Sequence, residues 1–171
     1  MNILKKFDKK NFSFLTQKNN FISLLIIIII FFLDRISKIQ IINHQLENNR
    51  FYINDFINLD LVWNTGIGFG FLSSNSNLFY NSITLIISCV IIFLVYLIIR
   101  SKLIDKIFYS MVIGGALGNF YDRLMYFAVP DFIDLHYRSF HWFTFNIADI
   151  FITIGIIGII SKDLFLKNDK N

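Results

Sequence analysis

The segment FYNSITLIISCVIIFLVYLII, residues 79–99, carries no charged side chain and is long enough to cross the hydrocarbon core of a bilayer as a helix. Lipid offers no hydrogen-bond partner to the backbone, so a segment of this kind satisfies its N–H and C=O groups internally. The whole chain has the same character, because 55% of its 171 residues are hydrophobic. This composition excludes an ordinary soluble domain and predicts an integral membrane protein.

Three further segments predict transmembrane helices. The first span, about 21–42, opens with an apolar run that stops at Leu33, so it must carry several charged residues across the far third of the bilayer. The third span covers about 107–127 and the fourth about 145–165. With residues 79–99 as the second span, we expect four transmembrane helices in a single membrane domain, residues 1–171.

The basic residues indicate the orientation of these spans. They gather before the first span, between the second and third, and after the fourth: Lys5, Lys6, Lys9, Lys10 and Lys18; Arg100, Lys102 and Lys106; Lys162, Lys167 and Lys170. The other two connections, 43–78 and 128–144, hold only Arg50 and Arg138. By the positive-inside rule both termini are cytoplasmic and these two connections face outward. The net charge of +4 is therefore explained by the orientation of the chain in the membrane, and no nucleic-acid partner is expected.

The outer loop 43–78 contains an alternating pattern. In RFYINDFINLDLVWNTGIGFGFL, residues 50–72, apolar and polar residues alternate as in half-buried strands. The predicted fold class is therefore an all-α membrane protein of four helices with a small β-sheet in the first outer loop.

Polar side chains inside the predicted spans gather at their outer ends. They are Asp34 and Lys38 in the first span, Asn119, Asp122 and Arg123 in the third, and Asn146 and Asp149 in the fourth. Helical periodicity places each group on one face of its helix, with Gly115 on the face of the third span and Thr153 on that of the fourth. Because buried charges are costly in a membrane and usually face the bundle interior, we expect an outward-facing polar pocket built from three helices. The second span contributes packing only.

Simpler roles remain open for part of this set. Asp34 and Lys38 are four residues apart and would also form a plain ion pair. Asp122 and Arg123 would also serve as a salt bridge at a helix end. For Arg35 the favoured interpretation is a side chain that reaches out to the lipid headgroups.

Two aspartates suggest the chemistry. Asp149 lies about one turn inside an apolar helix, which favours function over a helix-end charge, and Asp131 lies in the loop that leads to it. Two carboxylates in a low-dielectric site share a proton, so one acts as general base on a water and the other as general acid. The pattern therefore indicates the arrangement used by aspartic proteases.

Other chemistries fit this sequence poorly. It has no G-x-S-x-G motif, and its lone cysteine, Cys89, lies in an apolar segment as a packing residue. His44, His136 and His141 lack H-E-x-x-H or another familiar metal spacing, so neither a metal nor a cofactor is expected. A Ser/Lys hydrolase would pair Lys38 with Ser73 or Ser74, but Asp34 already offers Lys38 a partner.

Five ordered blocks carry a family resemblance. FLDRISK, WNTGIGFGF, GGALGNFYDRL, VPDF and FNIADIFITIG, in this order across four spans, resemble the lipoprotein signal peptidase family, also called signal peptidase II. The resemblance implies an aspartic endopeptidase, multi-pass in the bacterial inner (cytoplasmic) membrane, with its active site facing outward to the periplasmic side. It would remove the signal peptide from prolipoproteins whose cysteine carries a diacylglyceryl group, in contact with membrane lipid.

The same resemblance assigns roles to individual residues. It implies that Asp131 and Asp149 are the catalytic pair. The positions implied to bind substrate or support the pair are Asp34, Lys38, Asn64, Gly66, Asn119, Asp122, Arg123, Asn146 and Ala148. One block departs from the family pattern, because Ile67 and Gly68 stand where the family usually has two alanines. This departure puts the shape of the outer pocket wall in doubt, and not the catalytic pair.

A different class of function would also use acids in spans. In a small multi-pass transporter or proton-conducting subunit, Asp34, Asp122 and Asp149 would form a relay. A relay requires acidic groups at several depths, whereas these acids cluster toward one side of the bilayer. We therefore treat the transporter as the alternative to the peptidase.

Overall fold

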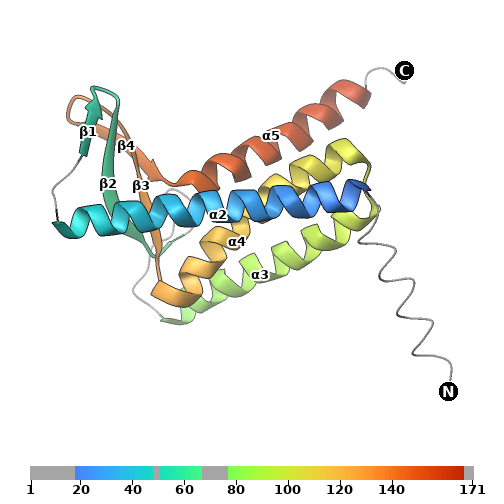
Figure 1. Cartoon of the computed structure of the whole chain (residues 1–171), viewed down its shortest axis with the longest axis horizontal. Helices are drawn as coiled ribbons and strands as arrows, with labels where there is room; N and C mark the ends of the chain where they lie inside the picture. Colours follow the sequence, from blue (N-terminus) through green and yellow to red (C-terminus); the bar gives the residue numbers. More distant parts are fainter. Residues whose placement is uncertain (1–17, 48–50, 67–76, 168–171) are drawn as a thin grey trace.

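The computed structural model describes residues 18–47, 51–66 and 77–167. In chain order these residues form helix α2 (Lys18–Glu47), strands β1 (Phe51–Asn54) and β2 (Ile57–Asn64), helices α3 (Asn77–Arg100) and α4 (Leu103–Tyr126), strands β3 (Val129–Tyr137) and β4 (Phe140–Phe145), and helix α5 (Ile147–Lys167). The helices run side by side along the long axis, and the sheet lies at one end of the bundle (Figure 1).

Helix α4 is the centre of the bundle and packs against α2, α3 and α5. Its glycines allow the close approach. A Cβ at Gly114 would lie 2.9 Å from Cβ of Ile30 on α2, and one at Gly115 would lie 2.5 Å from the carbonyl oxygen of Ala148 on α5. Small residues at such positions bring helix backbones together where lipid gives no hydrophobic drive for association.

The sheet is antiparallel and joins both connections that the sequence predicts to face outward. Its strand order is β1-β2-β3-β4, so β1 and β2 come from one connection and β3 and β4 from the other. The prediction of a small sheet is confirmed, but it placed the whole sheet in the first connection and missed β3 and β4. Two strands alone are marginally stable, and the second pair completes the sheet. The burial of most of β3 hides the alternation that would have revealed it.

A β-bulge in β2 positions a polar side chain. Leu59 pairs with Ile133 and Val62 pairs with Asp131, so β2 holds one more residue than β3 between these two pairs. The extra residue reverses which side chains of β2 share a face with those of β3. Asn64 consequently lies opposite Val129 and on the same face as Asp131.

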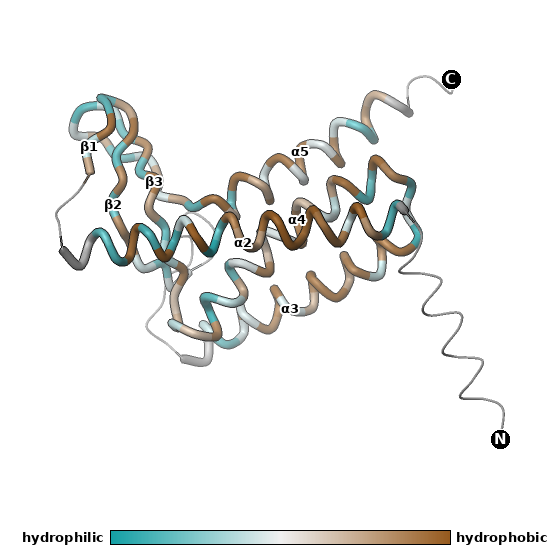
Figure 2. Tube along the Cα trace, viewed as in Figure 1, coloured by the Kyte–Doolittle hydropathy of each residue, from teal (hydrophilic) through white to brown (hydrophobic). Residues whose placement is uncertain are grey.

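Burial in the helical bundle is inverted relative to a soluble protein. Leu85 and Ile92 on α3 are each 66% exposed, whereas Asp34 and Lys38 on α2 are fully buried. Figure 2 shows apolar residues along the middle of the helices and polar ones toward both ends of the bundle. Among the described residues one stretch, Tyr80–Arg100 of α3, is long and apolar enough to cross a membrane by length and composition. The other helices interrupt their apolar runs with charged residues.

The helices match the predicted spans in place but not in their ends. Helix α2 extends beyond the predicted 21–42 at both ends, and α4 begins earlier than the predicted 107. Helix α4 ends before Phe127, which has a left-handed backbone conformation with φ of 55°. The fourth helix begins two residues after the predicted start at about 145, because Phe145 still belongs to β4 and α5 begins at Ile147.

Candidate active site

Asp131 lies in β3 at the junction of sheet and helices, and it is 2% exposed. Its two carboxylate oxygens accept hydrogen bonds from side-chain amides: Asn64 Nδ2 donates to Oδ2 over 2.8 Å, and Asn146 Nδ2 donates to Oδ1 over 2.6 Å. Burial raises the pKa of Asp131 to about 7, and the negative charge of Asp149 contributes to the rise. The amide hydrogen bonds oppose this shift, since they favour the ionised form.

Asp149 lies in the first turn of α5, where Asn146 caps the helix. The cap is reciprocal: the backbone N–H of Asp149 donates to Asn146 Oδ1 over 3.1 Å, and that of Asn146 donates to Asp149 Oδ2 over 3.2 Å. The other oxygen of Asp149 accepts a hydrogen bond from Asn119 Nδ2 on α4, at 2.8 Å. Asn146 therefore contacts both aspartates: Asp131 through its side-chain Nδ2, and Asp149 through its side-chain Oδ1 and its backbone N–H.

Lys38 connects the helices behind this pair. Its buried ammonium donates to Asp34 Oδ2 and Asp122 Oδ2, each over 2.7 Å, and to Asn119 Oδ1 over 2.8 Å, which uses all three of its protons. The other oxygen of Asp34 accepts the backbone N–H of Ala148 over 2.9 Å. Asp34 and Lys38 thus fix α4 and α5 to α2. The simpler role that the sequence left open, an ion pair within one helix, describes only part of these contacts.

Arg35 corrects one expectation. It does not reach toward headgroups; it is buried, pairs with Asp122, and lies with its guanidinium carbon 4.7 Å from the centre of the Tyr121 ring. Asp122 is held between Arg35 and Lys38, and the salt bridge with Arg123 that the sequence left open is not among the ion pairs of the described residues. A buried carboxylate requires such partners, because an unpaired charge is costly there.

Arg123 faces the sheet side of the site. Its Nη2 donates to the carbonyl oxygen of Gly66, and the Gly66 N–H in turn donates to Asn64 Oδ1 over 2.8 Å. Tyr80 on α3 donates to the Arg123 carbonyl oxygen over 2.8 Å. Nε and Nη1 of Arg123 are buried and have no hydrogen-bond partner among the described residues.

Tyr80 and Arg35 are the site residues that sequence reasoning missed. The sequence analysis assigned only packing to residues 79–99, yet Tyr80 holds the backbone of Arg123 and its ring lies 5.5 Å from the guanidinium carbon. Its position at the start of the apolar run was the one available signal. For Arg35 the available signal was its position in the sequence: it lies between Asp34 and Lys38, which were already candidate site residues.

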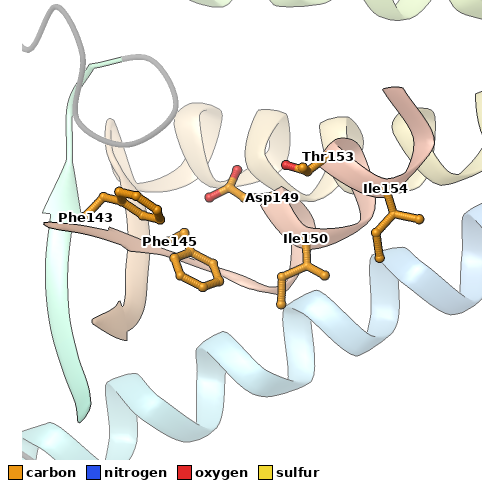
Figure 3. A pocket seen from close by; sticks show the side chains of 6 residues that line it. All are labelled: Phe143, Phe145, Asp149, Ile150, Thr153 and Ile154. Atoms are coloured by element: carbon orange, nitrogen blue, oxygen red, sulfur yellow. The ribbon is translucent and has the colours of Figure 1, made fainter. Parts of the chain in front are cut away.

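Two apolar cavities meet at Asp149. One, of about 280 Å³, is lined by Phe143 and Phe145 of β4 together with Asp149, Ile150, Thr153 and Ile154 of α5. Figure 3 shows Asp149 and Thr153 projecting from one side of α5 and Ile150 and Ile154 from another. The second cavity, of about 320 Å³, lies among α3, α4 and α5, and its lining includes Val90, Ala116, Asn119, Arg123, Asp149 and Ile152. A carboxylate between two apolar cavities is placed to act on a ligand with apolar flanks.

A model of the family described as Signal peptidase (SPase) II matches residues 26–165, a range that includes every side chain of this site. The chain belongs to the signal peptidase II family. It is 46% identical over 155 residues to the lipoprotein signal peptidase of Pelagibacter ubique (strain HTCC1062), covering 90% of this chain and 93% of that relative. It is 35% identical over 157 residues to the lipoprotein signal peptidase of Anaplasma phagocytophilum (strain HZ), covering 91% and 99%.

Two solved structures of bacterial membrane enzymes share the fold of this chain. A bacterial membrane enzyme structure determined by the in meso method at 2.3 Å resolution has a TM-score of 0.72 and 35% identity, covering 87% of this chain and 91% of that one. A second, at 1.9 Å resolution, has a TM-score of 0.68 and 34% identity, covering 83% and 92%. At these identities the likeness concerns the whole arrangement of helices and sheet.

The signal peptidase II resemblance can be compared with the geometry residue by residue. All eleven positions that it implied lie in the contacts described above: Asp131, Asp149, Asp34, Lys38, Asn64, Gly66, Asn119, Asp122, Arg123, Asn146 and Ala148. Ile67 and Gly68, where the sequence departs from the family pattern, lie outside the described residues, as do Ser73 and Ser74. The roles of the eleven residues are taken up as proposals below.

Proposed function

We propose that this chain is an aspartic endopeptidase that removes the signal peptide from prolipoproteins whose cysteine carries a diacylglyceryl group. The curated relatives named lipoprotein signal peptidase support the substrate class. The observation that carries the chemistry is the junction at Asn146, which contacts Asp131 from the sheet and Asp149 from the bundle.

The proposed mechanism uses one proton and one water. Near neutral pH the aspartate pair holds a single proton, because the pKa of Asp131 is about 7 and the charge of Asp149 raises it. The ionised carboxylate takes a proton from the water as the water oxygen attacks the peptide carbonyl carbon. The protonated carboxyl then gives its proton to the leaving amine as the C–N bond breaks. The proton titrates with the pair as a unit, so the two roles belong to the pair.

Arg123 and the cavities supply substrate binding in this proposal. Nε and Nη1 of Arg123 lack partners among the described residues, and Arg123 lines the larger cavity beside Asp149. A buried guanidinium in this state gains most from a carbonyl or ester oxygen of the bound substrate. The apolar lining of both cavities suits the signal helix and acyl chains on either side of the scissile bond.

The proposed location is the bacterial inner membrane, with α2, α3, α4 and α5 spanning it and the sheet on the periplasmic surface. Two observations support it. The helices expose apolar side chains and bury charged ones, as expected when the surroundings are lipid. Among the described residues, Arg100, Lys102, Lys106 and Lys162 lie toward the helix ends away from the sheet (Figure 1), which the positive-inside rule assigns to the cytoplasm. A single membrane domain follows from this arrangement.

The test uses Asp131→Asn and Asp149→Asn with Asp163→Asn as the matched control, since Asp163 is exposed near the far end of α5. Cleavage of a diacylglyceryl-modified precursor is followed by mass spectrometry in purified protein and liposomes. We expect each site variant to lose about 10³-fold or more in rate, because one positioned acid or base contributes about 10²–10⁴-fold.

The controls separate catalysis from folding and from metal dependence. The variants should accumulate in the membrane at the level of Asp163→Asn, and the unlipidated precursor should remain intact. Cleavage should continue in a metal chelator. Normal cleavage by Asp131→Asn or Asp149→Asn, or loss of cleavage with chelator and recovery with Zn²⁺, would rule out the two-aspartate mechanism.

A further inference from the structure

Asp134, His136 and His141 form a second cluster of titratable side chains, away from the aspartate pair. Asp134 and His136 lie on β3 and His141 on β4. One ligand atom from each residue lies within 4.8 Å of the other two. The register shifts beside β3 place their extra residues on β2 and β4, so the alternation of β3 itself is kept and puts Asp134 and His136 on the face opposite Asp131.

A β-bulge brings His141 into the cluster. Leu135 pairs with Phe143 but His136 pairs with His141, so Trp142 is an extra residue in β4. If the first register continued, Trp142 would lie opposite His136, and His141 would point to the other face of the sheet. Bulges commonly re-aim side chains at functional sites. Here the bulge is what places two imidazole rings side by side, with centroids 5.4 Å apart.

His136 provides an independent observation that points to a ligand. The residue is 6% exposed, and its Nδ1 is buried with no hydrogen-bond partner among the described residues. That atom lies 3.7 Å from Asp134 Oδ2, too far for a hydrogen bond, while His141 Nδ1 lies 2.7 Å from the same oxygen. An imidazole nitrogen that is buried without a partner costs free energy unless something binds it.

Asn58 on β2 completes the surroundings of His136. Its Nδ2 lies 3.4 Å from His136 Nε2, and its own Oδ1 is buried without a partner among the described residues. A half-turn of the Asn58 amide would place Oδ1 against Nε2, where it accepts the Nε2–H proton. This exchange satisfies both groups and leaves the lone pair of Nδ1 free to bind a metal. Metal-bound histidines usually donate their other ring N–H in this way.

We propose that Asp134, His136 and His141 bind a divalent transition metal ion, Zn²⁺ in particular, on the face of the sheet opposite Asp131. Ligand atoms about 2.0–2.1 Å from a tetrahedral metal ion are about 3.4 Å apart, and the two measured separations, 2.7 and 3.7 Å, lie on either side of that value. His141 has room to adjust, because its side chain is 45% exposed.

The donor set selects the class of metal. Two imidazoles and one carboxylate suit Zn²⁺ and related transition ions, whereas Mg²⁺ and Ca²⁺ prefer oxygen ligands. Binding requires both histidines to be neutral with their protons on Nε2, so the proton between His141 and Asp134 leaves Nδ1. The bound ion would fasten β4 to β3, and a water would occupy its fourth position. The proposal does not depend on the peptidase function.

The test measures metal binding to the full-length, detergent-solubilised protein without a histidine tag. Zn²⁺ binding is followed by calorimetry, and Co²⁺ by its visible absorption bands. The variant is His141→Ala, whose site is exposed, and the matched control is His44→Ala, the exposed histidine on α2. We expect one equivalent of Zn²⁺ in the unmodified protein and in His44→Ala, and at least tenfold weaker binding in His141→Ala.

A thermal measurement distinguishes a metal site from a cluster that only stabilises the sheet. Zn²⁺ should raise the unfolding temperature of the unmodified protein and of His44→Ala, but not that of His141→Ala, and Mg²⁺ should have no such effect. Equal Zn²⁺ binding by the unmodified protein and His141→Ala, equal loss in both histidine variants, or an equal response to Mg²⁺ would each overturn the proposal. Cleavage of lipidated precursor should persist in chelator, since the two sites lie on opposite faces of β3.

Discussion

Asn146 shows how one residue can couple two carboxylates from different elements. Its side-chain amide donates to Asp131 through Nδ2, while its Oδ1 and backbone N–H are used by Asp149 in the cap of α5. If the Asn146 amide rotated to change its hydrogen bond with one aspartate, its hydrogen bond with the other would break. The position of Asp131 relative to Asp149 is therefore set by the start of a helix, which is rigid, and not by the connection alone.

The pKa of Asp131 leads to a prediction about pH. If the pair must hold one proton, kcat/KM falls as pH rises through about 7, by about tenfold per pH unit, because the proton is lost there.

The free energy of unfolding should also decrease as pH rises through this range. The folded pKa exceeds the ordinary 3.8, so this carboxyl's contribution to the free energy of unfolding is complete below about 4 and is lost as pH rises through about 7.

Asn64→Ala tests the assignment of that alkaline limb to Asp131. The Asn64 amide lowers the pKa of Asp131 by stabilising the ionised form, so its removal should move the limb to higher pH. Asn81→Ala, at an exposed position on α3, is the matched control and should leave the limb in place. A pH profile of kcat/KM for the three proteins decides the matter, and a limb that stays fixed in Asn64→Ala would assign it to another group.

At the scale of elements, the sequence predicted helices better than strands. An uninterrupted apolar run such as residues 79–99 has few alternatives in lipid, so α3 could be placed directly. Strand β3 could not, because buried side chains on both of its faces remove the period-two signal. The bulges in β2 and β4 could not be predicted from the sequence either, because a one-residue change in pairing depends on the partner strand. Asn64 could be named from the family motif, but its contact with Asp131 needed the structure.

The contact between α4 and α5 gives a prediction for Gly115→Ala. The added Cβ would lie 2.5 Å from the Ala148 carbonyl oxygen and 2.9 Å from Ile152 Cγ1, so α5 must move away from α4. That movement separates Asn119 from Asp149. Overpacking costs about 1–3 kcal/mol, and we expect kcat/KM to fall by about tenfold or more.

Gly158→Ala is the matched control on the same helix. The three atoms nearest to its Cβ would all belong to the ring of Phe108, a side chain that can move, and Gly158 lies well along α5 from Asp149. We expect its kcat/KM to stay close to that of the unmodified protein. Kinetic assays with lipidated precursor and thermal unfolding curves on both variants provide the readout. Equal effects of the two glycines on activity would mean that the α4–α5 separation near Asp149 does not control catalysis.

The whole molecule separates apolar from polar side chains. The helices expose apolar side chains, and the polar and charged ones are buried where the bundle meets the sheet. The sequence predicted this division because hydropathy and the placement of Lys and Arg are properties of whole segments. The network at Lys38 was only partly foreseen: the pairing with Asp34 follows from helical spacing, whereas Arg35 and Asp122 meet across two helices.

The orientation of the molecule can be tested with single cysteines. In a Cys89→Ser background, Ser139→Cys places a thiol on the β3–β4 turn and Asp163→Cys places one near the end of α5, both at exposed positions. A membrane-impermeant maleimide should label Ser139→Cys in intact spheroplasts and Asp163→Cys only after the membrane is opened, because the positive-inside rule predicts a cytoplasmic α5 end. The reverse pattern would place the aspartate pair on the cytoplasmic side. A prolipoprotein's cleavage site, exported to the outer surface, could not reach it there, so the labelling result bears on the peptidase proposal as directly as the loss of either aspartate.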